Sequence, residues 1–230
     1  KIMGLKRSSS KNKEGSLFVG DTFYCSKDMV DYLTGNNAKE YGGGVYEETG
    51  TFTMTGGNIT GNNTEGEGGG VHTGSAIQVS GSPVIKDNVK GGHLEGEVYT
   101  GGTTNNCDLF VYAKTVYGKI IVTSALENDA KIGVTFKELE TTTPFAEALT
   151  GDTSYNSGKL SADDIKHFTS DNAKYTIYLN DDGKAIFGDK TKAYSWDDLK
   201  DKLSNASSDS ANPTKLTLNN NISYTGAKIA

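Results

Sequence analysis

The chain has 230 residues, enough for one compact core or for one elongated repeat domain with a small companion. Hydrophobic residues make up only 34%, but aromatic residues make up 9% and include 12 Tyr, which argues against a disordered chain. The net charge is −6 and no basic patch with interleaved aromatic residues occurs, so no nucleic-acid partner is expected. No apolar run approaches about 18 residues, so no membrane span is expected in this fragment.

The 29 Gly residues, set against only 3 Pro, indicate many tight corners between short strands. The sequence starts at Lys1 without an initiator Met, which favours a mature form or an excised fragment.

An internal repeat decides the expected architecture. The segment Gly42–Tyr46 (GGGVY) recurs as Gly68–His72 (GGGVH), 26 residues later. A degenerate upstream copy includes Leu33–Asn37, and a weaker downstream copy is expected at Gly96–Tyr99, giving about four turns.

Within each copy apolar residues alternate with polar ones, as in Phe52 and Met54 and then in Ile77 and Val79. This period of two predicts about three short strands per copy, each with one buried face. One copy cannot bury its apolar face alone, so stacking of copies is expected to form a continuous core. The prediction is an all-β fold, a right-handed parallel β-helix, because the six-residue, calcium-binding and propeller repeats do not fit.

Asn residues occupy equivalent corners of the predicted coil, at Asn36, Asn62 and Asn88. Asn tolerates the left-handed backbone conformation, and its amide can stack into a ladder of side chains.

The segment Gly42–Asn62 resembles a repeat of large surface proteins from Gram-positive gut and oral bacteria, whose fold is similar to the pectin-lyase-like β-helix superfamily. The resemblance continues through Ala130–Val134 and through Phe168–Tyr175, which resembles the segment that closes such domains, and covers roughly residues 15–188. It implies an extracellular or cell-surface location, and it implies little about activity because a fold does not determine function.

Three parts of the chain are expected: β-helix repeats at 1–136, a closing β segment with a hairpin at 137–190, and a cap-like helix plus strand at 191–230. Asp182-Gly183 predicts the turn of the hairpin. Ser161 is the expected N-cap of a short helix. Trp196, Leu199 and Leu203 fall on one face of a C-terminal amphipathic helix, which could cap this coil or begin the next solenoid unit.

No catalytic residue is predicted. The repeats contain no Arg that could serve as the base of a lyase, and a hydrolase on this fold needs paired carboxylates on adjacent turns. The adjacent acids Asp163-Asp164, Asp181-Asp182 and Asp197-Asp198 fall in helix starts and a turn. Corner acids such as Glu47 are expected to be solvated.

No metal and no cofactor are predicted either. His72, His93 and His167 lack the spacing of metal ligands. Cys25 and Cys107 form no CxxC motif, and the sequence leaves open whether they pair in a disulfide.

The candidate binding residues are Tyr46, His72 and Tyr99, each following a predicted buried Val. Stacked about 4.8 Å apart, they would form an outward aromatic ladder that could contact sugar rings, or that could simply hold adjacent turns together. The leading hypothesis is a noncatalytic adhesin or stalk module of a secreted or cell-surface protein, with glycans or surface components of host or bacterium as partners. The alternative is a polysaccharide-degrading enzyme, either a lyase or a glycoside hydrolase.

Overall fold

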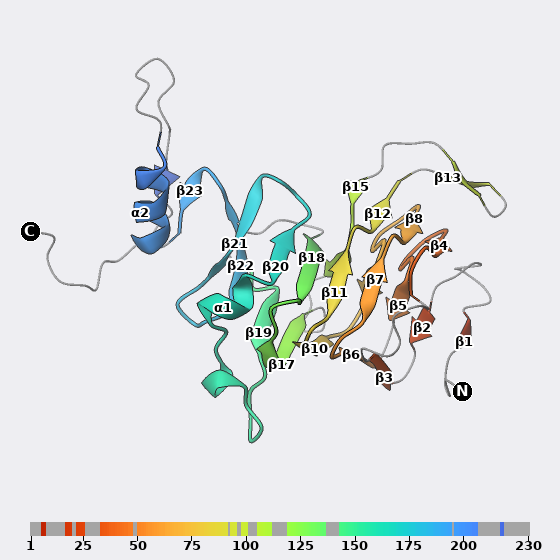
Figure 1. Ribbon diagram of the computed structural model, residues 1–230, viewed down its shortest axis with the longest axis horizontal. Helices are drawn as coiled ribbons and strands as arrows, with labels where there is room; N and C mark the ends of the chain where they lie inside the picture. The colour runs from red at the N-terminus through yellow and green to blue at the C-terminus, as the bar shows by residue number, and fades with distance from the viewer. Residues whose placement is uncertain are drawn as a thin grey trace, which may run out of the picture.

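The computed structural model describes residues 6–7, 17–19, 22–25, 33–47, 50–91, 93–95, 98–100, 105–111, 119–136, 143–194, 196–206 and 217–218. Most of these residues lie in short β-strands, many of them paired in parallel, and only two short α-helices occur among them. The expected all-β class is therefore confirmed. Along the longest axis the chain runs broadly from β1 near the N-terminus to β21, β22 and α2 near the C-terminus, whereas β13 lies at the same end as β1 (Figure 1).

Three sheets contain nearly all the described strands. In spatial order, the first sheet consists of β1 (Lys6–Arg7), β2 (Leu17–Val19), β5 (Val45–Glu47), β9 (Val71–Thr73), β16 (Leu109–Val111), β18 (Lys131–Phe136), β11 (Val84–Lys86) and β7 (Asn58–Thr60), with β20 (Phe168–Ser170) also paired to β18. The second consists of β21 (Tyr175–Leu179), β22 (Ala185–Asp189), β19 (Ala146–Ala148), β17 (Ile120–Leu126), β10 (Ile77–Gly81), β6 (Thr51–Met54) and β3 (Thr22–Cys25). The third consists of β15 (Asn105–Asn106), β12 (Val89–Lys90), β8 (Asn63–Thr64) and β4 (Asn37–Ala38).

The 26-residue repeat is the structural unit of these sheets. Each of the two clear copies forms four short strands, β5 to β8 and β9 to β12, where three were predicted. Equivalent strands pair in parallel, placing Val45 opposite Val71 and Ile59 opposite Ile85. Because identical positions stack, the alternation of apolar residues along one copy becomes a continuous apolar interior along the whole stack.

The interior consists of the apolar residues that the alternation predicts. Phe52, Met54, Ile77 and Val79 are fully buried, whereas Gln78 between the last two is partly exposed. Large side chains fill the middle of the stack, and their removal from water is the main stabilising contribution. The largest fully buried apolar side chains are Phe52, Phe110, Phe145, Phe187, Met54, Ile59, Ile77, Ile85, Leu109, Ile120 and Ile132.

The strand that follows the second clear copy was wrongly predicted. The segment expected at Gly96–Tyr99 does not stack on β9; instead β14 (Val98–Thr100) pairs antiparallel with β13 (His93–Glu95) in a separate hairpin. The strand that continues the stack is β16, with Leu109 opposite Val71. A short alternating segment suits a hairpin as well as a stacked strand, so periodicity alone could not choose between them.

The closing segment contains the predicted hairpin and one strand that was not predicted. Strands β21 and β22 pair antiparallel across a turn at which Gly183 has a φ of 72°, as the Asp182-Gly183 signal indicates. Helix α1 (Ala162–Ile165) begins with the expected Ser161 cap, which forms a full capping box with Asp164. Strand β19 was missed because its alternation involves Ala, a residue with weak preference for strands.

Helix α2 (Trp196–Ser204) is anchored to the hairpin that precedes it. Lys202 donates a hydrogen bond of 2.6 Å to the Tyr178 hydroxyl of β21 and pairs with Asp198 within the helix. Leu203, on the predicted apolar face, is 58% exposed. Trp196 and Leu199 on the same face are partly buried. No helix among the described residues is long and apolar enough to cross a membrane.

Candidate functional site

Tyr46 and His72 lie side by side on the first sheet, as predicted. They are opposite residues of the parallel strands β5 and β9, and their ring centroids are 5.4 Å apart. Both are partly exposed, whereas Val45 and Val71 beside them are fully buried, so the two rings lie on the face of the sheet away from the interior.

Tyr99 does not belong to this row. Its backbone lies in the separate β13–β14 hairpin, opposite Leu94. The third position is occupied by Phe110 of β16, whose ring stacks on His72 with centroids 5.3 Å apart and planes 10° apart. Phe110 is only 1% exposed, so the accessible part of the row ends at His72.

Tyr41 contributes a further aromatic ring that was not predicted from the sequence. Its ring lies 4.7 Å from His72 and 5.8 Å from Tyr46, and the residue is 37% exposed. We define Tyr41, Tyr46 and His72 as the aromatic patch. The signal for Tyr41 was its place immediately before Gly42–Gly44, which stack on the equivalent glycines of the next copy.

Glycines let adjacent copies approach closely enough for these rings to stack. A side chain at Gly43 would lie 2.2 Å from the carbonyl oxygen of Gly69, and one at Gly70 would lie 2.6 Å from the Asn88 amide nitrogen. Both are far below van der Waals contact, so only glycine fits. The GGG element thus fixes the spacing of the strands that carry the aromatic patch.

A second cluster of polar residues runs along one corner of the stack, as the Asn spacing predicts. The Oδ1 atom of Asn62 accepts hydrogen bonds from the backbone N–H and the side-chain amide of Asn36, at 2.9 and 3.0 Å. Asn88 accepts the same two bonds from Asn62, at 3.1 and 2.9 Å. Asp108 continues the series by accepting from the backbone and side chain of Asn88, at 2.7 and 2.9 Å. We call Asn36, Asn62, Asn88 and Asp108 the corner ladder.

The ladder ends in a pair of acids that the sequence analysis did not identify. Asp171, just after β20, accepts a 2.8 Å hydrogen bond from the Asp108 backbone N–H and a 2.5 Å bond from the Thr135 hydroxyl. It reaches Asp108 across β18, where Gly133 leaves room: a side chain there would lie 2.0 Å from Asp108 Oδ2. The only signal for Asp108 was a Cys-Asp step before an apolar strand, which has no repeat spacing.

Burial raises the pKa of the Asp108 carboxyl to about 7, and the negative charge of Asp171 is the second cause of this increase. Burial also raises the pKa of Asp171 above its ordinary value. The buried Asp108 and the partly buried Asp171 lie beside each other, and two such carboxyl groups resist holding two negative charges at once. Asp108 is only 5% exposed, so little of it is open to a ligand.

Glu47 is a correction to the expectation of solvated corner acids. It follows Tyr46 on β5, points to the same side as Val45 and is completely buried. Its Oε2 atom accepts hydrogen bonds from the Thr73 hydroxyl at 2.7 Å and from the Ser75 N–H at 3.0 Å. The carboxylate thereby holds the turn between β9 and β10 of the next copy, which is a structural task.

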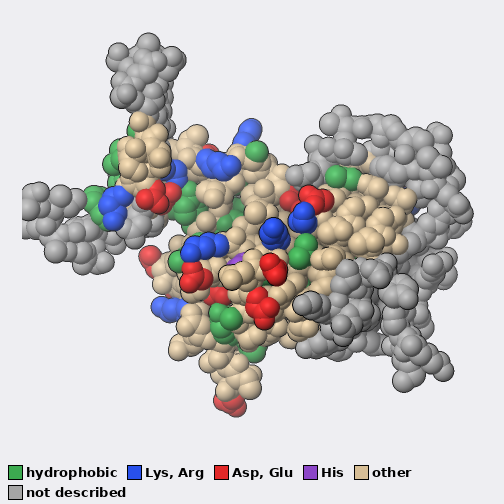
Figure 2. Space-filling model, viewed as in Figure 1, with side chains coloured by type: hydrophobic (Ala, Val, Ile, Leu, Met, Phe, Trp, Pro, Cys, Tyr) green, Lys and Arg blue, Asp and Glu red, His purple; other side chains and the backbone are tan. Residues whose placement is uncertain are grey.

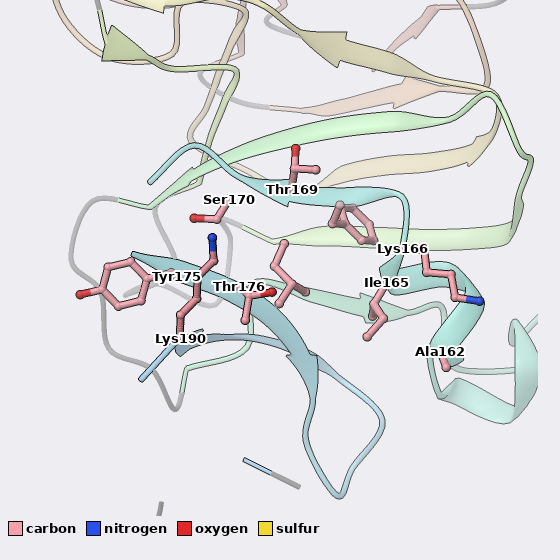
Figure 3. A pocket seen from close by; sticks show the side chains of 10 residues that line it. Ala162, Ile165, Lys166, Thr169, Ser170, Tyr175, Thr176 and Lys190 are labelled. Atoms are coloured by element: carbon pink, nitrogen blue, oxygen red, sulfur yellow. The ribbon is translucent and has the colours of Figure 1, made fainter. Parts of the chain in front are cut away.

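A groove of about 550 Å³ lies between helix α1 and strands β20 and β21 (Figure 3). Thr169 and Ser170 line one side and Thr176 the other, and the Lys190 side chain points toward Ser170, while that of Lys166 points away (Figure 3). Lys166 pairs with Asp163 at 2.5 Å. Lys and acidic side chains are interspersed over the described part of the face that Figure 2 shows.

Metal and thiol chemistry find little support in the described residues. No three His, Cys, Asp or Glu side chains among them are grouped as metal ligands. Cys107 is a free, buried thiol whose pKa is raised by burial, and its sulfur accepts a hydrogen bond from the Gly68 N–H at 3.1 Å. It serves as a packed corner residue.

Comparison of the chain with known protein families, with curated proteins and with solved structures found no match.

Proposed function

We propose that this chain is a noncatalytic module of a secreted or cell-surface bacterial protein, an adhesin or stalk built as a right-handed parallel β-helix. The in-register parallel pairing of successive copies supports the β-helix. Such a coil grows by adding copies and presents side chains at a fixed spacing along its length. This geometry suits a spacer or a linear binding surface.

The aromatic patch carries the binding part of the proposal. Three rings from two adjacent copies lie within 4.7 to 5.8 Å of each other, and the exposed Tyr41 and the partly exposed Tyr46 each carry a hydroxyl group. Sugar rings have apolar faces and polar edges, which match aromatic faces that end in hydroxyl groups. The proposed ligand is therefore a glycan of a host or bacterial surface.

A glycan array with the wild-type protein, followed by titration of the best ligand, tests this function. Replacement of Tyr46 or Tyr41 by Ala should weaken binding by about twofold to tenfold, since an aromatic contact contributes about 0.5 to 1.5 kcal/mol. Tyr99→Ala is the matched control, because its backbone belongs to the separate hairpin, and it should bind as the wild type does. Unchanged binding by both patch variants would contradict a glycan role for the patch.

A second candidate function, polysaccharide cleavage, is favoured by one observation. Asp108 and Asp171 form a carboxyl pair, and the pKa of Asp108 is raised to about 7, as a general acid requires. Its 5% exposure and its use of Oδ1 to bind Asn88 favour a structural role instead. Release of oligosaccharides from a uronate or neutral polysaccharide, abolished by Asp108→Asn, would replace the noncatalytic proposal.

A further inference from the structure

The corner ladder depends on side chains that both accept and donate. Each Asn amide oxygen receives two hydrogen bonds from the preceding ladder residue. The amide nitrogens of Asn62 and Asn88 each donate one bond to the next ladder residue. Asn62 also donates to the Leu33 carbonyl at 2.8 Å, and Asn88 donates to the carbonyls of Ile59 and Lys86 at 2.9 and 3.0 Å. Every polar atom of the side chain is used, as a fully buried Asn requires.

Asp108 takes the place of an Asn in this series but differs in one atom. Its Oδ1 accepts from Asn88 as an Asn oxygen would. Its Oδ2 stands where an Asn would have the donating nitrogen, and its neighbour is the acceptor Asp171. An ionised carboxylate has no hydrogen to donate, whereas a protonated one has a single O–H group that reproduces the missing donor.

We propose that Asp108 is a proton-dependent joint, which continues the ladder when it carries a proton and repels Asp171 when it does not. The joint connects the corner of the repeat stack to the turn after β20 of the closing segment. Proton loss leaves two negative carboxylates beside each other, the buried Asp108 and the partly buried Asp171, which weakens the attachment of β20 to the stack.

The other charged groups around the joint do not remove this repulsion. Lys86, at the end of β11, is electrostatically coupled to Asp108, but its ammonium pairs with Asp87 at 2.6 Å. Lys90 of β12 is coupled to the thiol of Cys107. The side chains that hydrogen-bond to the pair among the described residues are neutral: Asn88 on Asp108 and Thr135 on Asp171.

The direction of the pH dependence follows from the pKa difference between the two states. The pKa of Asp108 is about 7 in the folded protein, against 3.8 for an ordinary Asp. Its contribution to stability is therefore complete below about pH 4, falls as the pH rises, and is lost above about pH 7. The raised pKa of Asp171 acts in the same direction.

Urea unfolding of the wild type and of Asp108→Asn between pH 5 and pH 8 tests the joint. Asn supplies the donor at every pH, so the ratio of the two unfolding equilibrium constants should shift at least about tenfold in favour of the variant over this range. Asp171→Asn should act similarly, because its amide can donate to an ionised Asp108. Asp163→Asn replaces an exposed acid and is the control, so the pH dependence of its unfolding should follow that of the wild type.

Two results would overturn the proposal. One is a stability difference between wild type and Asp108→Asn that is the same at pH 5 and pH 8. The other is an NMR titration in which the carboxyl carbon of Asp108 has its midpoint near pH 4. Hydrogen exchange at the Asp108 amide, which donates to Asp171, gives a local readout and should accelerate, beyond its intrinsic pH dependence, as the pH passes 7.

Discussion

At the corner of the stack, single polar side chains hydrogen-bond to buried polar groups of the adjacent copy, which apolar side chains cannot do. Asn62 is completely buried and makes four hydrogen bonds, two through its oxygen and two through its nitrogen. Buried polar groups are costly unless they are paired, so each ladder residue depends on its neighbours in the adjacent copies. Gly43 and Gly70 allow adjacent copies to approach closely, because neither residue has a Cβ atom that would clash with the next copy.

Asn62→Ala should be far more destabilising than Asn63→Ala. The first change removes the acceptor of the Asn36 side-chain amide and backbone N–H and the side-chain donor to the Leu33 carbonyl, and it leaves Asn88 Oδ1 with only the backbone N–H of residue 62, at about 3 kcal/mol or more of unfolding free energy. Asn63 is partly exposed and its side chain donates one bond, to Asn37 at 3.0 Å, so its loss should cost about 1 kcal/mol or less. Urea unfolding of both variants makes the comparison, and equal effects would contradict a cooperative ladder.

At the scale of elements, local signals were reliable where one short segment fixes its own geometry. The capping box at Ser161 and the glycine turn at Gly183 are complete within a few residues, so the sequence was sufficient to predict them. Strand β16 and the Asp108–Asp171 pair instead depend on which segments meet after an inserted hairpin, and that choice is made by tertiary packing. The aromatic row was predicted at Tyr46 and His72 because their copies stack in register. The prediction failed at Tyr99 because its segment forms the separate β13–β14 hairpin instead of a stacked strand.

Loss of the Ser161 cap should destabilise the closing segment modestly. The Ser161 hydroxyl accepts from the Asp164 N–H at 3.1 Å, and the Asp164 Oδ2 atom accepts from the Ser161 N–H at 2.7 Å. Ser161→Ala should therefore cost about 1 kcal/mol in thermal unfolding, whereas Ser161→Thr should retain most of the stability. Ser154→Ala at a neighbouring exposed site is the control, and an equal effect there would argue against a role for the cap.

At the scale of the whole molecule, stability should depend on contacts between adjacent copies. Ile59, Ile85 and Ile132 stand in register on consecutive strands β7, β11 and β18, and all three are fully buried. Ile85 is the register partner of both Ile59 and Ile132, whereas the strands of Ile59 and Ile132 are separated by β11. The proposed β-helix thus behaves as a chain of nearest neighbours.

Double mutants of these three isoleucines test that behaviour. Each Ile→Val change should cost about 0.5 to 1.5 kcal/mol by opening a small cavity. The pairs Ile59/Ile85 and Ile85/Ile132 share that cavity, so their combined costs should depart from the sum by about 0.5 kcal/mol or more. Ile59 and Ile132 are two strand spacings apart, about 9.6 Å, so their costs should add. If the coupling energy between Ile59 and Ile132 equalled that of the adjacent pairs, the nearest-neighbour description would be wrong. The whole interior would then contribute to stability as a single cooperative unit.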